Sequence, residues 1–144
     1  LLDKYKSQFL DVANDPLYPF FYGLSYTNFS YGNLSLNSTQ LTPHSNIQVS
    51  MPVSNTGKYD GEEVVQLYVQ DLVATVTRPV KELKGFKKIF LEAGESRMVT
   101  FRITESDLRH YNINMEYVAE PGNFKVMIGP DSKTLKEAGF TLLK

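Results

Sequence analysis

The chain has 144 residues, of which 42% are hydrophobic, and 15 basic against 16 acidic side chains give a formal net charge of −1. This length suits one domain with a substantial core, and the near balance of charge argues against a domain dedicated to nucleic acid. The absence of cysteine, together with only two histidines and no long apolar run, predicts no disulfide, no metal site, no cofactor and no membrane span.

The first 25 residues lack the pattern of the rest and predict an extended, aromatic-rich linker. Residues 17–26 contain five aromatic side chains, but proline and glycine interrupt them and they do not alternate with polar residues as a strand would. Aromatic side chains in such a segment need a surface to cover them, and we expect part of that surface to lie elsewhere in the protein. The chain also begins with Leu1 rather than methionine. We therefore expect it to be a piece of a longer polypeptide.

From residue 26 to residue 144 the apolar positions recur with a period of two, which predicts an all-β domain. In residues 63–70, Val65, Leu67 and Val69 share one face, while Val64 and Tyr68 lie on the other. Because both faces carry apolar side chains, this pattern indicates a strand covered on both sides. Turns recur at the spacing of an antiparallel, immunoglobulin-like β-sandwich rather than that of alternating strands and helices. The predicted strands cover residues 26–36, 47–53, 63–70, 88–91, 98–103, 124–128 and 139–143.

Local signals mark the connections between these strands. The alternation slips near Gly32, so we predict an irregularity in the first strand. Residues 92–95, Glu-Ala-Gly-Glu, predict a hairpin loop whose glycine supplies a positive φ. Thr104, followed three residues later by Asp107, predicts one short capped helical turn that carries the chain between two sheets.

The acidic residues do not form the facing pair that general acid–base hydrolysis requires. Glu62 and Glu63 are neighbours on one predicted strand, so their side chains point to opposite faces. The remaining candidates lie at strand ends or in the helical turn, and solvated surface charge is our interpretation of the whole set. These residues are Asp60, Glu62, Glu63, Asp71, Glu105 and Asp107.

The basic residues also lack a catalytic arrangement. His44 follows a proline in a predicted loop and His110 follows the helical turn, so we interpret both as surface or packing residues. No Gly-x-Ser-x-Gly motif supplies a nucleophile for either of them. Four lysines are divided between the two faces of one strand, which favours an edge strand protected by charge over an anion-binding patch. They are Lys81, Lys84, Lys87 and Lys88.

Residues 18–26, Tyr-Pro-Phe-Phe-Tyr-Gly-Leu-Ser-Tyr, resemble the motif that opens the C-terminal fibronectin type III-like domain of glycoside hydrolase family 3 enzymes. Phe21 stands where the family usually has glycine, so we expect the local backbone or its neighbouring surface to differ here. The resemblance extends over essentially the whole chain. Further motifs follow in the family's order at residues 53–57, 63–69, 77–86, 92–96 and 120–124.

This resemblance implies a non-catalytic fibronectin type III-like β-sandwich at residues 26–144, preceded by the linker at residues 1–25. The parent would be a retaining, exo-acting β-glucosidase or β-xylosidase, periplasmic or secreted from a bacterium. Its catalytic residues lie in domains that these 144 residues do not include, so none is carried over. The domain would pack against the catalytic domains of the same polypeptide and meet a glycoside only through the whole enzyme. The predicted docking residues are Tyr18, Pro19, Phe20, Phe21, Tyr22, Tyr26 and Arg78.

Two other classes of function remain open from the sequence. A carbohydrate-binding module would present exposed aromatic side chains such as Tyr18, Phe21, Tyr22 and Tyr26, although the chain has no tryptophan. A cell-surface spacer or adhesion domain would be accompanied by repeats or similar neighbouring domains, and this chain shows no internal repeat.

Overall fold

The computed structural model of the chain describes residues 27–72, 81–112 and 114–144. The predicted linker and its boundary at residue 26 lie outside these residues. In chain order the elements are β1 (Phe29–Tyr31), β2 (Ser35–Leu36), β3 (Gln40–Leu41), β4 (Asn46–Asn55), β5 (Gly61–Asp71), β6 (Lys81–Leu91), β7 (Ser96–Thr104), the short 3-10 helix η2 (Glu105–Leu108), β8 (His110–Tyr111), β9 (Tyr117–Val118), β10 (Gly122–Gly129) and β11 (Lys136–Leu142).

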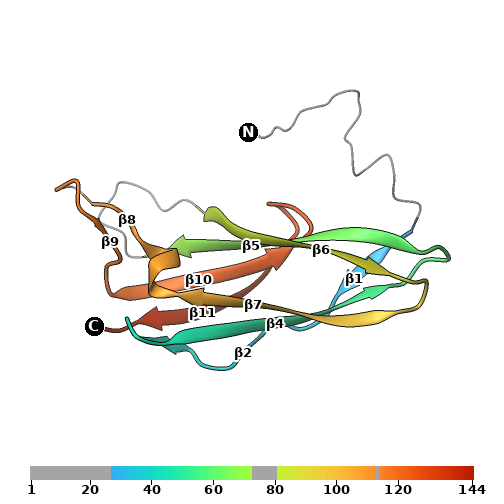
Figure 1. Ribbon diagram of the computed structural model, residues 1–144, viewed down its shortest axis with the longest axis horizontal. Helices are drawn as coiled ribbons and strands as arrows, with labels where there is room; N and C mark the ends of the chain where they lie inside the picture. Colours follow the sequence, from blue (N-terminus) through green and yellow to red (C-terminus); the bar gives the residue numbers. More distant parts are fainter. Residues whose placement is uncertain (1–26, 73–80, 113) are drawn as a thin grey trace, which may run out of the picture.

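The strands form two facing sheets, which confirms the predicted all-β sandwich (Figure 1). One sheet has β4 at its centre, with β7 on one side and with β1 and β2 in succession on the other. The second sheet has the strand order β3-β11-β10-β5-β6. Among the described strands every pairing is antiparallel except that of β11 with β3, and β8 with β9 forms a separate ribbon at one end (Figure 1).

The first predicted strand is divided into β1 and β2 by one extra residue. Tyr31 lies opposite Val53, and Ser35 lies opposite Ser50. The chain therefore advances four residues from β1 to β2 while β4 advances three. The backbone N–H of Gly32 still donates to a β4 carbonyl at 2.8 Å. The predicted irregularity near Gly32 is therefore confirmed as a bulge that bends the edge of this sheet.

Alternate residues of the central strands build the core between the sheets. On β4 the buried positions are Ile47, Val49, Met51 and Val53, as the period of two predicts. The facing sheet contributes Phe124, whose ring stacks on that of Phe140 with centroids 5.6 Å apart. The other buried apolar residues of this second sheet include Val65, Leu67, Val69, Val126 and Ile128.

The strand β6 is an edge strand, as its lysines predicted, but it is longer than the predicted segment at residues 88–91. A bulge lies opposite Leu67 and Tyr68, where Lys84 is left without a partner residue on β5. Three apolar side chains of β6 are exposed: Leu83 at 51%, Phe86 at 66% and Phe90 at 49%. The outer face of β6 is therefore open to solvent. On the neighbouring β5, predicted to be covered on both sides, the outward Val64 and Tyr68 are half-buried.

Two local predictions are confirmed at the turns. Gly94 has a φ of 83° in the loop between β6 and β7, where a side chain would be strained. At η2 the carboxylate of Asp107 accepts a hydrogen bond of 2.8 Å from the backbone N–H of Thr104, while Leu108 is buried. This short helix therefore closes the core at the end of β7. In the described part of the chain, no helix has the length and apolar character needed to cross a bilayer.

Candidate functional site

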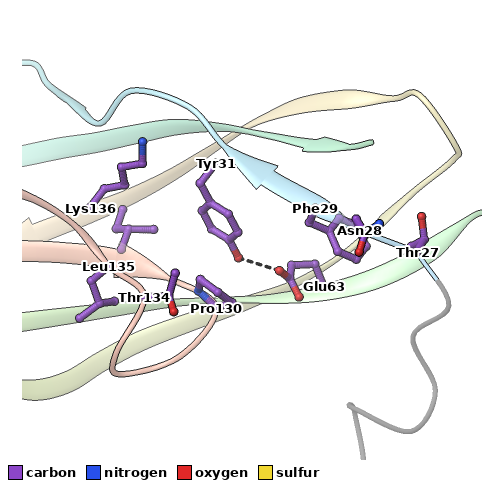
Figure 2. Close-up of a pocket in the computed structure, with 10 residues that line it drawn as sticks. Thr27, Asn28, Phe29, Tyr31, Glu63, Pro130, Thr134, Leu135 and Lys136 are labelled. Atoms are coloured by element: carbon purple, nitrogen blue, oxygen red, sulfur yellow. Dashed lines mark hydrogen bonds between the residues drawn. The ribbon is translucent and has the colours of Figure 1, made fainter. Parts of the chain in front are cut away.

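A pocket of about 320 Å³ opens where β1, β5 and the loop between β10 and β11 meet (Figure 2). Figure 2 shows Tyr31 and Glu63 pointing toward each other across this pocket, with Phe29 beside Glu63. The loop side is formed by Pro130 and Thr134. The remaining described residues that line the pocket are Thr27, Asn28, Ile128, Leu135 and Lys136.

A hydrogen bond between Tyr31 and Glu63 joins the two sheets across the pocket. The Tyr31 hydroxyl donates to Oε2 of Glu63 over 3.0 Å (Figure 2). Tyr31 belongs to the sheet of β4, whereas Glu63 belongs to β5 in the facing sheet. Glu63 has the same strand parity as Val65, so its side chain points inward rather than to solvent. A polar link thus takes the place of apolar packing where the core ends.

Burial raises the pKa of both groups in this pair. For Glu63 the loss of solvent outweighs the Tyr31 hydrogen bond, which by itself stabilises the carboxylate, so the pKa of Glu63 lies above its ordinary value. For Tyr31, burial and the adjacent Glu63 charge together raise the pKa of the hydroxyl far above its ordinary value. The negative charge of Asp131 also raises both pKa values. Glu63 in the pocket and the nearby Asp131 are therefore the acidic groups that act on Tyr31.

The described residues that line the pocket include one carboxylate and several groups that could bind a ligand. Glu63 is the sole acidic side chain among the described residues that line the pocket, so these residues hold one carboxylate where acid–base hydrolysis uses two. Groups of three or more potential metal ligands are also missing from the described residues. Toward a ligand the pocket has one carboxylate, the Tyr31 hydroxyl and the aromatic rings of Phe29 and Tyr31, and Lys136 and two threonines also line it.

Each of the predicted docking residues lies outside the described residues. Six of them belong to residues 1–26 and one to residues 73–80. Their predicted role therefore stays a prediction. The residues in question are Tyr18, Pro19, Phe20, Phe21, Tyr22, Tyr26 and Arg78.

The interpretation of Glu63 as surface charge is wrong, whereas that of Glu62 is right. Glu62 is exposed and forms an ion pair with Lys88 at 3.4 Å on the outer face of the sheet. Glu63 is half-buried on the inner face. The parity that separates the two residues was visible in the sequence, because Glu63 shares the face of Val65 and Leu67. The pairing with Tyr31 was not visible, because it depends on how the two sheets lie across from each other.

The two histidines lie apart from each other, one in a surface loop and one at the start of β8. His44 is exposed in the loop before β4. His110 starts β8, and its buried Nε2 lies 3.9 Å from Oε1 of Glu120. Neither histidine lines the pocket of Glu63.

Comparisons with known proteins agree with this architecture. Residues 63–132 match the family model described as the fibronectin type III-like domain. The chain is 48% identical over 141 residues to a periplasmic β-glucosidase of Salmonella typhimurium, covering 98% of the chain and 18% of that protein. It is 46% identical over 140 residues to a putative β-xylosidase of Formosa agariphila, with coverage of 97% and 18%.

A solved structure shows the same fold within a longer chain. The chain superimposes on the crystal structure of a GH3 β-glucosidase from Bifidobacterium adolescentis with a TM-score of 0.74 and 36% identity, covering 87% of this chain and 18% of that one. In all three comparisons the match therefore spans less than a fifth of the longer protein.

Proposed function

This chain is a fibronectin type III-like domain of the kind that glycoside hydrolase family 3 enzymes contain, and we propose that it is a non-catalytic structural part of such an enzyme. Its role is to pack against and stabilise the catalytic domains of a longer polypeptide. The observation that carries the proposal is the asymmetry of coverage, since 98% of this chain matches 18% of a β-glucosidase. The parent enzyme would be a retaining, exo-acting β-glucosidase or β-xylosidase.

The surface of the sandwich supports a packing role. Leu83, Phe86 and Phe90 expose large apolar side chains along the outer face of the edge strand β6. Large apolar side chains that stay exposed together on one strand face can mark a site where a protein binds another surface. The lysines of the same strand counter the pairing of the edge with another sheet, and Lys88 is already paired with Glu62. These exposed side chains thus favour packing of another domain against the face of the sheet rather than pairing with its edge strand.

The same comparison supports a proposal about the cellular location. The Salmonella typhimurium relative is a periplasmic enzyme. We propose that the protein containing this domain acts in the periplasm or outside the cell. The lack of cysteine in these residues is compatible with an oxidising compartment, because no free thiol needs protection there.

The purified 144-residue chain is expected to release no aryl group from an aryl β-glucoside or β-xyloside. The reason is that the described residues lining the pocket hold one carboxylate, that of Glu63, whereas acid–base hydrolysis uses two. The measurement is product absorbance over hours at high protein concentration, with an authentic β-glucosidase as the positive control. Turnover that disappears in a Glu63→Gln variant would show that the chain is itself an enzyme and would overturn the proposal.

A further inference from the structure

Glu63 is a half-buried carboxylate, and the hydrogen-bond donors that the described residues give it are neutral. They are the Tyr31 hydroxyl and the backbone N–H of Val64. No lysine or arginine in the described parts of the chain comes within ion-pair distance of it, in contrast to Glu62 on the other face. A carboxylate accepts up to about four hydrogen bonds, so Glu63 keeps capacity for further donors. Removing a carboxylate from water without a cationic partner costs free energy.

The surroundings of Glu63 add to its demand for a positive charge. Asp131 contributes further negative potential at the pocket. Lys136 lines the pocket, but Figure 2 shows its ammonium pointing away from the Glu63 carboxylate. Phe29 and Tyr31 supply aromatic rings, whose faces attract cations. Acidic groups and aromatic faces together therefore prefer a cation over a neutral or anionic ligand.

We propose that the pocket of Glu63 receives a guanidinium group, namely the side chain of an arginine from the part of the polypeptide outside these 144 residues. A guanidinium is planar, stacks on aromatic rings and donates two parallel hydrogen bonds to a carboxylate. A pocket of about 320 Å³ has room for such a group. The arginine would pair with Glu63 while its plane lies against Phe29 or Tyr31.

The position of the pocket favours an occupant from the same polypeptide, an assignment that rests on the proposed function. Thr27 and Asn28 line the pocket and are the first described residues, so the chain enters the sandwich at this place. The matched relatives are more than five times as long as this chain, because it spans 18% of them. An arginine bound here would hold the sandwich against the rest of the enzyme, in addition to the covalent connection through the chain.

The test uses the 144-residue chain with N-acetyl-arginine amide as the probe, followed by two-dimensional amide NMR. We expect saturable, millimolar binding that shifts the amide signals of Asn28, Tyr31 and Thr134. The matched neutral probe is N-acetyl-citrulline amide, which has the same shape but a urea in place of the guanidinium. It is expected to bind about tenfold more weakly, since hydrogen bonds between charged partners are the stronger ones.

Substitutions at two neighbouring residues test whether the arginine probe binds at Glu63. Glu63→Gln keeps an acceptor for Tyr31 but removes the charge, so it should weaken binding of the arginine probe about tenfold. Glu62→Gln removes a charge one residue away on the opposite face and should leave the affinity unchanged. Equal binding of the two probes, or equal weakening by the two variants, would overturn the proposal. Either result would leave the proposed function standing, because the turnover measurement on the unmodified chain does not involve this ligand.

The source of the arginine is tested in the longer polypeptide. There, Glu63→Gln should lower the thermal midpoint of unfolding, whereas Glu62→Gln should not. If the isolated chain binds the arginine probe selectively but the midpoint is the same for both variants, an arginine of the same polypeptide is not the occupant and the assignment is overturned.

Discussion

Replacing Asn55 by alanine is expected to lower the free energy of unfolding by about 3–5 kcal/mol, because four hydrogen bonds of its buried side chain are lost, one of them buried and three part-buried. Asn55 is 1% exposed and uses its whole amide. Its Nδ2 donates to the carbonyls of Tyr59 at 2.8 Å and Leu91 at 3.0 Å. Its Oδ1 accepts from the Thr27 hydroxyl at 2.6 Å and from the N–H of Gly57 at 3.0 Å. No alanine side chain can replace these contacts.

The measurement is urea unfolding of both chains, compared through midpoint and slope. Asn55→Asp should cost at least as much, because a buried oxygen would then face the two carbonyl groups that Nδ2 now satisfies. The control is Asn114→Ala, the same change at an exposed position, which should stay within about 0.5 kcal/mol. Losses of similar size at Asn55 and Asn114 would show that the amide network does not hold the loop between β4 and β5.

Replacing Phe124 by alanine is expected to cost about 3–5 kcal/mol of unfolding free energy, through lost burial and the cavity left behind. Phe124 is 2% exposed on β10 and stacks on Phe140 of the neighbouring strand. The matched control is Phe86→Ala on β6, where the ring is 66% exposed and should contribute about 1 kcal/mol or less.

Both phenylalanine variants are measured by the same urea titration. If the two substitutions cost the same, the inner face of the second sheet is not the core. If Phe86→Ala instead improves solubility at unchanged stability, the exposed ring is dispensable for folding. That result is expected when Phe86 belongs to a surface that another domain covers.

Strand positions were predictable wherever one face is buried and the other is not. The alternation in β4 placed Ile47, Val49, Met51 and Val53 in the core, and the structure confirms all four. Most of β6 was missed, because its lysines and exposed apolar residues follow no single-faced pattern on an edge strand. Short strands such as β3 were missed because their hydrogen bonds come from a partner about a hundred residues away in β11.

The pocket of Glu63 could be predicted only in part. The inward parity of Glu63 is a property of β5 alone and was present in the sequence. Its hydrogen bond to Tyr31 joins residues on different sheets, so it depends on how the sheets are placed across from each other. It also depends on the bulge after β1, since a shift of one residue would turn Tyr31 to the other face.

The most direct test of a structural role compares the longer polypeptide with and without residues 27–144. The quantity is the temperature at which the catalytic part unfolds, followed together with aryl β-glucosidase activity after heating. We expect deletion to lower that temperature and to speed the loss of activity. The reason is that the surface of the catalytic part that the apolar face bearing Phe86 and Phe90 covers would become exposed. An unchanged unfolding temperature with unchanged activity would contradict the account, because the domain would then stabilise nothing but itself.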